Sequence, residues 1–422
     1  MADLLDVAVI GGGAAGIAAA RRLTAKGRSV LVVEALPRLG GRARTIAFDG
    51  LPLDLGCHWL HSAARNPLAR EAEAQGLVLQ HGRGAWRHRL PEPLNALQDQ
   101  GDGWAAYAAL ADRLRRAPPA SDRASDALAG RDRWRPFVDA ISSFANGVEL
   151  DRLSVADFLA YENAGGASNW RLSMGYGAFI AELGAPLPRA FSTRVLSVSQ
   201  GDEISLETDR GPIRARAAIV TASSAMLAAG AIRFTPSIDE HLQAATRLPL
   251  GLANKVFLSL DATHRLPAEA HLMGDLHRAA TGSYYLRPLG RPLIEGFLGG
   301  ANAKALEAEG KPAAIAFVKD ELAGLFGSTF VQGLTPIIAT AWGQEPTIGG
   351  SYSHALPGHA SARAVLARPI SEQLCLAGEA CSLTDFSTAH GAWESGLAAA
   401  DVIDQGLGAR SRRASPVAGG RS

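Results

Sequence analysis

The chain has 422 residues, of which 20% are charged and 47% are hydrophobic, enough for about two or three domains with substantial cores. Its 42 basic and 41 acidic residues leave a formal net charge of +1, which gives no general attraction to nucleic acid or to an anionic membrane. Three cysteines are an odd number for a disulfide framework, and Met1–Asp6 lacks the basic region that begins a signal peptide. We therefore expect a cytoplasmic protein without nucleic-acid or membrane partners; the sequence does not indicate an oligomeric state.

The chain opens with a predicted strand–turn–helix–strand unit of the kind that builds a parallel sheet. Asp6–Ile10 is a short apolar run with β-branched residues, Ala14–Ala25 is an alanine-rich helical stretch, and Ser29–Glu34 resumes a strand.

The turn of this unit carries Gly11, Gly13 and Gly16 in the spacing G-x-G-x-x-G. The first glycine permits a tight turn, the second lets a pyrophosphate approach the backbone, and the third lets the helix pack closely on the strand. Glu34 ends the next strand, where a carboxylate can accept hydrogen bonds from a ribose. The alternative is a glycine-rich turn without a ligand, but the surrounding pattern favours a dinucleotide site.

Helices and strands alternate in the rest of the chain. The stretch of about 70–190 is predicted to be mostly helical, and the uncharged run 322–344 is predicted to be buried strand and loop because glycines and a proline interrupt it. Turn residues divide a strand-rich region into a β-meander with strands at 194–199, 203–208, 213–215 and 218–222. The later predicted elements are strands at 255–260, 293–298 and 373–378, helices at 303–326 and 387–405, and a disordered tail at 409–422.

A second glycine pair follows the predicted ribose-binding strand. The segment Leu39–Thr45 reads LGGRART, so that Gly41 and Arg42 could reach the phosphates or the ring system of an extended cofactor. A nicotinamide dehydrogenase would not need this second pair. The combination of GGGAAG, VEA and GGRART resembles the flavin-containing amine oxidases and their relatives, which bind FAD.

The resemblance continues near the C-terminus. LAGEA at Leu376–Ala380 and HGAWESGLAA at His390–Ala399 are similar to the second FAD motif of that family. Gly378 permits close backbone approach, and Glu379 can accept hydrogen bonds from cofactor hydroxyls. The resemblance extends over essentially the whole chain and is loosest in the segment 71–169.

This resemblance implies an α/β fold: a Rossmann-like FAD-binding domain of the p-hydroxybenzoate-hydroxylase type, with an inserted α+β substrate domain of mixed sheet and helices. The implied FAD-binding domain comprises 1–70, 190–255 and 340–408, and the substrate-binding domain comprises 71–189 and 256–339. The implied FAD-binding residues are Gly11, Gly13, Gly16, Glu34, Gly41, Arg42, Val195, Trp342, Gly378, Glu379 and Thr388. For Val195, a pure packing role of the side chain is an equal alternative to backbone contact with the adenine half.

Trp59-Leu-His61 looks like the polyamine-oxidase form of a segment that lines the active site. His61 matches the family's histidine, which could influence protonation of a substrate amine near neutral pH. A structural histidine bonded to the backbone is an equal alternative. Cys57, His58 and His61 could suggest a metal site, but no second ligand pair supports it, and we expect no metal.

Lys255 lies at the start of an apolar predicted strand, where an ammonium group costs desolvation unless it has a polar partner. The family has a lysine at this position, linked through water to flavin N5, which implies a role in the reaction of reduced flavin with oxygen. A lysine that extends to the surface is the alternative.

The segment 342–353 resembles the part of the family that runs along the flavin. Tyr352 matches an aromatic wall of the substrate site. Ser351 stands where the mitochondrial monoamine oxidases carry a cysteinyl link, so we expect non-covalent FAD. Thr388 stands where the second aromatic wall is expected, and Phe386 or Trp393 could replace that wall.

The resemblance implies FAD-dependent oxidation of a small-molecule amine: hydride transfer to flavin N5 gives an imine, and O2 reoxidises the flavin with formation of H2O2. Lys255, His61 and Tyr352 are the expected catalytic residues. A desaturase or dehydrogenase that acts on a C–C bond or uses another acceptor is the alternative, and a non-catalytic binding protein on the same scaffold is a third. The sequence does not identify the amine.

Overall fold

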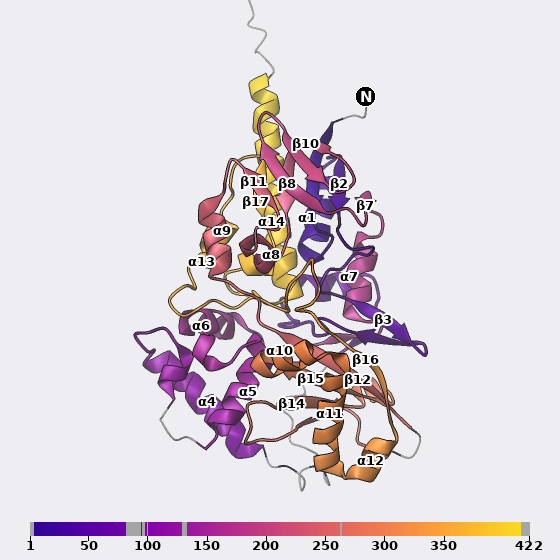
Figure 1. Cartoon of the computed structure of the whole chain (residues 1–422). Helices are drawn as coiled ribbons and strands as arrows, with labels where there is room; N and C mark the ends of the chain where they lie inside the picture. The colour runs from indigo at the N-terminus through magenta and orange to yellow at the C-terminus, as the bar shows by residue number, and fades with distance from the viewer. Residues whose placement is uncertain are drawn as a thin grey trace, which may run out of the picture. The chain divides into compact units, whose positions relative to one another are not determined.

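The computed structural model describes residues 4–81, 94, 98, 100–128, 133–261 and 264–414 (Figure 1). The chain forms two compact units, which are described separately. Unit 1 comprises Met1–Ala43, Phe179–Thr246 and Ser361–Ser422, and unit 2 comprises Arg44–Ala178 and Arg247–Ala360. Among the helices of the described ranges, none is both long enough and apolar enough to cross a lipid bilayer.

Unit 1 is built on an eight-stranded sheet. Its strands are β1 (Leu5–Ile10), β2 (Val30–Val33), β7 (Arg189–Ala190), β8 (Val195–Gln200), β9 (Ile204–Thr208), β10 (Ile213–Val220), β11 (Arg233–Thr235) and β17 (Leu374–Leu376). The order is β11-β8-β9-β10-β1-β2-β7, with β17 beside β10. Strand β1 lies parallel to both neighbours, with Val9 opposite Ile219 and Val32. The β-branched, apolar composition of these strands is typical of a parallel sheet that is covered on both faces.

Two long helices of unit 1 pack against each other (Figure 1). The helices that lie wholly or partly in this unit are α1 (Ala14–Ala25), α7 (Tyr176–Gly184), α8 (Ser224–Ala228), α9 (Asp239–Thr246), α13 (Ala362–Ala367) and α14 (Ala389–Ala414), with the short 3-10 helix η5 (Glu379–Cys381). A Cβ atom on Gly396 of α14 would lie 2.1 Å from the carbonyl oxygen of Ala15 in α1. The two helices therefore approach closely because glycine and alanine line their contact.

Unit 2 contains a five-stranded antiparallel sheet in the order β13-β14-β15-β12-β16. Its strands are β12 (Ala253–Leu260), β13 (Ala270–Met273), β14 (Gly282–Leu286), β15 (Leu293–Gly299) and β16 (Leu334–Ala339). Two short pairs accompany it, β3 (Thr45–Phe48) with β4 (Leu51–Asp54), and β5 (Leu79–Gln80) with β6 (Arg171–Leu172). The helices of this unit are α2 (Pro67–Ala74), α4 (Gly101–Arg116), α5 (Arg135–Asn146), α6 (Val155–Ala164), α10 (Gly300–Glu309), α11 (Lys311–Phe326) and α12 (Ser328–Gln332), with the 3-10 helices η2 (Ala124–Ala127), η3 (Leu150–Arg152) and η4 (Pro288–Gly290).

The two faces of the unit 2 sheet differ in chemistry. Successive residues of a strand point to opposite faces. One face packs its apolar side chains against α10 and α11, with Val256, Leu258 and Ile294 among its fully buried residues. The opposite face carries the polar residues Lys255, His271, Ser283, Tyr285 and Glu295 of four neighbouring strands. We refer to it as the polar face.

The predicted α/β fold is confirmed, and helix α1 has the predicted bounds. The β-meander is also confirmed, although its last two predicted strands form the single strand β10. The largely helical stretch 303–326 is confirmed as α10 and α11, which are separated at Gly310. Two predictions were wrong in detail: the run 322–344 includes α12, and α14 continues to Ala414, into the predicted tail. Residues 415–422 of that tail lie outside the described residues. The two compact units have other boundaries than the predicted domains, which stay a prediction.

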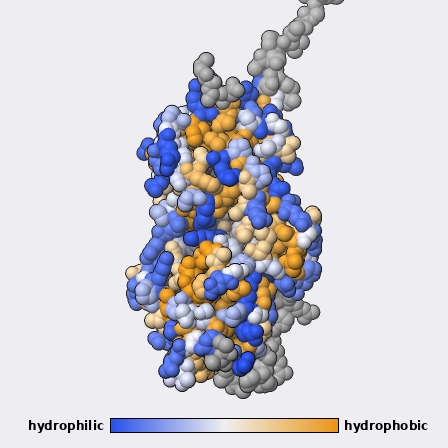
Figure 2. Space-filling model, turned by 90° about the vertical axis from the view of Figure 1, so that its right-hand side faces the viewer, coloured by the Kyte–Doolittle hydropathy of each residue, from blue (hydrophilic) through white to orange (hydrophobic). Residues whose placement is uncertain are grey.

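The surface mixes hydrophobic and hydrophilic residues, as Figure 2 shows for one face. Among the described residues, the large hydrophobic side chains that are well exposed are those of Val78, Leu196 and Leu383. Scattered exposure of this kind is ordinary for a folded protein.

Candidate active site and cofactor site

The glycine turn of unit 1 forms a cradle at the start of α1. Gly11 has a φ of +103°, and a Cβ atom on Gly16 would lie 1.9 Å from the carbonyl oxygen of Gly11. Gly13 precedes the first turn of the helix and has no side chain to cap it. The first N–H groups of α1 and the positive end of its dipole thus remain suited to a diphosphate.

Glu34 lies against this turn. Its side chain is buried, and its carboxylate accepts hydrogen bonds from the backbone N–H groups of Gly12 (2.5 Å) and Leu36 (2.7 Å). Burial raises the pKa of Glu34, and the two backbone donors oppose this shift. A carboxylate has about four acceptor positions, so it can still accept a ribose hydroxyl as the sequence predicts.

The two chain ends meet in unit 1. The backbone N–H of Gly40, beside Gly41, donates to the carbonyl of Gly12 over 2.8 Å. Arg42 Nη1 lies 2.8 Å from Glu379 Oε1, and the other oxygen of Glu379 accepts from the backbone N–H of Ser387 over 2.9 Å. The structure thus brings together the segments that carry the glycine turn, the second glycine pair and the C-terminal motif. These residues fit an extended dinucleotide cofactor.

Thr388 caps helix α14. Its hydroxyl accepts from the backbone N–H of Gly391 over 3.0 Å and donates to the carbonyl of Asp385 over 2.6 Å. His390, in the same turn, has its Nε2 atom 3.0 Å from Asp385 Oδ1. Thr388 is therefore engaged in the helix start, and its contact with FAD stays a prediction.

Two other predicted residues of unit 1 lie in packed surroundings. Val195 is buried in the sheet at the start of β8. Phe386 is also buried, and the guanidinium of the buried Arg363 lies 3.6 Å from its ring centroid. Because one face of this ring is occupied by a cation, it is a poor substitute for the missing aromatic wall. Contact of Val195 with the adenine half stays a prediction.

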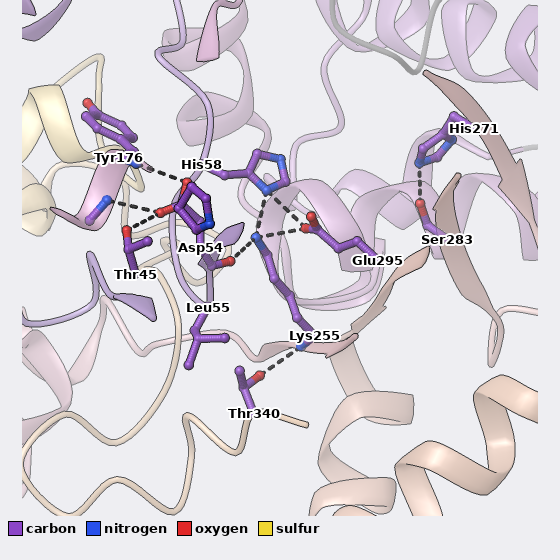
Figure 3. Close-up of polar contacts among 12 residues, drawn as sticks. Thr45, Asp54, Leu55, His58, Tyr176, Lys255, His271, Ser283, Glu295 and Thr340 are labelled. Carbon is purple, nitrogen blue, oxygen red and sulfur yellow. Dashed lines mark hydrogen bonds and ion pairs between the residues drawn. The ribbon is translucent and has the colours of Figure 1, made fainter. Parts of the chain in front are cut away.

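A buried ionic cluster lies on the polar face of unit 2 (Figure 3). Lys255 Nζ lies 2.8 Å from the carbonyl oxygen of Asp54, 2.7 Å from His58 Nδ1 and 2.8 Å from Glu295 Oε1. His58 Nδ1 is also 3.0 Å from Glu295 Oε1. The Lys255 side chain is only 4% exposed, so the alternative of a lysine that extends to the surface is wrong. We call Lys255, His58 and Glu295 the lysine cluster.

Strand register explains why this cluster forms. Lys255 of β12 lies opposite Phe297, and Glu295 of β15 lies opposite Phe257, so both charged side chains point to the same face as diagonal neighbours. The segment that follows β4 is fixed by Asp54, whose carboxylate accepts from Thr45 Oγ1 (2.5 Å) and from the backbone N–H of Tyr176 (3.0 Å). The Asp54 carbonyl is thereby held towards Lys255.

The electrostatics favour one ion pair with a neutral imidazole. Burial raises the pKa of Glu295, but its contacts with His58 and Lys255 outweigh this and bring the pKa well below its ordinary value. Burial lowers the pKa of His58, with Lys255 adding to this shift and Glu295 opposing it. A charged carboxylate and an ammonium cancel, so the resting cluster has no net charge.

A ring-and-arginine group lies beside the cluster. The rings of Trp59 and Tyr285 stack with centroids 6.3 Å apart, and the guanidinium of Arg171 lies 4.9 Å and 5.1 Å from their centroids. Arg171 also pairs with Glu269. A small cavity of about 30 Å³ adjoins this group, with His58, Glu295 and Arg171 in its wall. This volume suits about one or two water molecules.

The predicted histidine His61 does not belong to the lysine cluster. Its Nδ1 atom lies 3.1 Å from Asn169 Oδ1, and its carbonyl accepts from Asn66 Nδ2 over 2.9 Å. His58, in the same segment, takes the place beside Lys255. An active-site role of His61 stays a prediction.

Trp342 and Tyr352 also lie in unit 2. Trp342 donates from Nε1 to the carbonyl of Leu55 over 3.1 Å, and its backbone N–H donates to Asn254 Oδ1 over 3.0 Å. The Tyr352 hydroxyl donates to the carbonyl of Phe144, and burial raises its pKa. Both residues are anchored within the unit, and their contacts with cofactor or substrate stay predictions.

The sequence prediction missed His58 and Glu295. Glu295 is the only charged residue of β15, and Lys255 is the only one of β12. Two opposite charges in apolar strands of one sheet are a signal for an ion pair, because neither charge is stable alone in such a strand. For His58, the sequence suggests only the role of a metal ligand.

The glycine cradle of unit 1, with Glu34 against it, defines a dinucleotide-binding protein. The model of the flavin-containing amine oxidoreductases matches residues 14–404, so the chain belongs to this family. It is an FAD-dependent oxidoreductase that acts on amines, with FAD bound non-covalently.

Individual relatives support this family membership. The chain is 28% identical to polyamine oxidase 4 of Oryza sativa subsp. japonica, over 94% of this chain and 88% of that protein. It is 27% identical to polyamine oxidase 2 of Arabidopsis thaliana, over 94% and 87% of the two chains. Lysine-specific histone demethylase 1 homolog 2 of Oryza sativa subsp. japonica is 28% identical over 94% of this chain and 57% of that protein.

A solved structure shares the fold. Cyclohexylamine oxidase from Brevibacterium oxydans IH-35A superposes with a TM-score of 0.76, with 20% identity, over 96% of this chain and 100% of that one. This likeness supports the fold prediction.

Proposed function

We propose that this protein oxidises a small-molecule amine with O2 as the electron acceptor and releases H2O2. FAD, which the glycine turn at Gly11–Gly16, Glu34 and Glu379 would hold, would supply the redox chemistry: acceptance of a hydride from the carbon next to the amine nitrogen, which leaves an imine, and transfer of the electrons to O2. The relatives named polyamine oxidase and the structural neighbour named cyclohexylamine oxidase support an amine as substrate.

The buried Lys255 ammonium is the observation that carries this proposal. In the oxygen step, negative charge develops on the oxygen molecule, and a fixed, buried ammonium group stabilises such charge. Lys255 therefore serves the oxygen side of the reaction. His61 and Tyr352 shape the substrate side, where exclusion of water would favour the neutral amine that can lose a hydride.

Anaerobic reduction tests the proposal. The purified holoprotein is mixed without oxygen with mono-, di- and polyamines, and the flavin absorbance is followed. Bleaching by one amine class, followed by stoichiometric H2O2 when air is admitted, is the expected result. Flavin that stays oxidised with every amine would contradict amine oxidation. Flavin that is reduced by an amine but reoxidised only slowly by air would indicate a dehydrogenase with another acceptor.

A further inference from the structure

The three hydrogen-bond donors of the Lys255 ammonium have three protein acceptors within 2.7–2.8 Å: the Asp54 carbonyl, His58 Nδ1 and Glu295 Oε1. An ammonium group has three N–H donors and no acceptor. Its orientation is thus fixed on all three sides, and of these acceptors only Glu295 carries a charge. Lys255 has this environment in the interior of unit 2, where an unpaired ammonium would tend to release its proton.

We propose that Glu295 is a positioning residue that keeps Lys255 protonated and oriented for the oxygen step. The inference rests on the proposed function, because it assigns Lys255 to that step. It adds a residue that acts through the lysine: the Glu295 carboxylate stabilises the charged form of the amine and, together with the Asp54 carbonyl and His58 Nδ1, holds the ammonium in place.

His58 completes the arrangement through its tautomer. When Lys255 is charged, it donates to Nδ1 of a neutral His58, and the imidazole proton is then on Nε2. His58 Nδ1 is also 3.0 Å from Glu295 Oε1, so a proton on Nδ1 can be donated to that carboxylate. If Lys255 lost its proton, His58 would take the other tautomer and donate from Nδ1. The tautomer of His58 therefore reports the charge of Lys255.

The surrounding ionisable groups leave Glu295 as the partner of Lys255. His271 on β13 is neutral near pH 7, because burial lowers its pKa to about 4. Burial also raises the pKa of Tyr285 on β14 and keeps it neutral. The titratable and charged groups that face Lys255 from the elements packed around it are Asp54, His58, Arg171, His271, Tyr285, Arg291 and Glu295. The Asp54 carboxylate accepts hydrogen bonds from Thr45 and Tyr176. Lys255 donates to the backbone carbonyl of Asp54 and not to its carboxylate.

The variant Glu295→Gln tests the proposal, because it removes the charge and keeps a hydrogen-bonding side chain of the same shape. Glu321→Gln is the matched control. Glu321 is a second partly buried carboxylate, whose acceptors are occupied by Thr281 Oγ1 (2.7 Å) and the backbone N–H of Gly282 (2.7 Å). It belongs to α11, on the other face of the same sheet.

The first readout needs no activity. The chain has only five lysines, so labelling the lysine ε-carbons with 13C gives five NMR signals, and the signal lost in Lys255→Met identifies Lys255. In the wild type and in Glu321→Gln, this signal should show the shift of a charged lysine at pH 7. In Glu295→Gln it should move towards the shift of a neutral lysine, and His58, followed by its 15N shifts, should change tautomer with it. A signal that stays charged in Glu295→Gln would overturn the proposal.

The second readout is the oxygen step alone. The bound flavin is reduced by light under anaerobic conditions and mixed with buffer containing O2, so no amine substrate is needed. In Glu295→Gln, reoxidation should be at least tenfold slower than wild type, and this loss should shrink as the pH falls, because acid favours the charged form of Lys255. A loss of equal size at all pH values would show a merely structural role and overturn the proposal.

If the proposed function is wrong, these measurements give a different set of results. If Lys255→Met reoxidises at the wild-type rate, Lys255 does not serve the oxygen step. If amines fail to reduce the wild type while light-reduced flavin still reacts with O2, amine oxidation fails. In both cases the NMR measurement still decides whether Glu295 keeps Lys255 protonated.

Discussion

Lys255 and Glu295 form an ion pair with 2.8 Å between Nζ and Oε1, from side chains that are 4% and 9% exposed. The two residues lie on neighbouring antiparallel strands, on the face of the sheet opposite the core beneath α10 and α11. Two charges removed from water in this way depend on each other, since either one alone would be a buried charge without its main partner.

A double-mutant cycle measures this dependence. Lys255→Met or Glu295→Met alone should lower the free energy of unfolding by about 3–5 kcal/mol, because each leaves the other charge buried. The double variant should be within about 2 kcal/mol of wild type, since two apolar side chains replace the pair. Urea unfolding at pH 7 measures all four proteins. Lys304→Met, at an exposed lysine, is the control and should change stability by less than about 0.5 kcal/mol. Additive losses in the double variant would show that the pair is not coupled.

His271 should make stability fall in mild acid. Burial lowers its pKa from 6.5 to about 4. Above pH 6.5 the residue is neutral in both states and contributes nothing. Between pH 6.5 and about 4 only the unfolded chain takes up the proton, so unfolding becomes easier as the pH falls. At pH 5 this costs about 2 kcal/mol relative to pH 7.

His271→Gln removes this proton uptake. Between pH 7 and pH 5, the variant should lose about 2 kcal/mol less unfolding free energy than the wild type. Urea unfolding at both pH values is the measurement, and the exposed His277→Gln should keep the wild-type pH dependence. Equal slopes for His271→Gln and wild type would refute the buried neutral state.

The local sequence pattern was sufficient to predict much of the fold. Helix α1 was predicted with its observed bounds because an alanine-rich run begins just after the glycine turn and ends before Gly27. The residues around Lys255 were not predicted, because strand register decides them. A shift of one residue in β15 would turn Glu295 to the apolar face. The sequence does not specify that register, so it predicts a partner for Lys255 without identifying it.

Gly16, in the glycine turn, lies too close to the preceding strand for a side chain to fit. In Gly16→Ala, the new Cβ atom would lie 1.9 Å from the Gly11 carbonyl oxygen, so α1 must move away from the strand. We expect at least tenfold weaker FAD binding and lower stability. Gly408→Ala in α14 is the matched control, because its Cβ atom meets nothing within 4 Å and alanine favours a helix by about 1 kcal/mol. FAD retained after gel filtration and urea unfolding measure the two effects. Full FAD retention in Gly16→Ala would contradict the cradle.

Two variants of Thr388 distinguish its role in capping α14 from a contact with the cofactor. Its hydroxyl bonds to the Gly391 N–H and the Asp385 carbonyl, so Thr388→Val, which keeps the shape and removes the hydroxyl, should cost about 1–2 kcal/mol of unfolding free energy. Thr388→Ser keeps the hydroxyl and should lose less than half of that. The same comparison applied to FAD release tests the predicted contact. If the residue serves only the helix, both variants retain FAD as the wild type does once their stability is matched by temperature. If its hydroxyl also binds FAD, Thr388→Val releases the cofactor several times faster than Thr388→Ser.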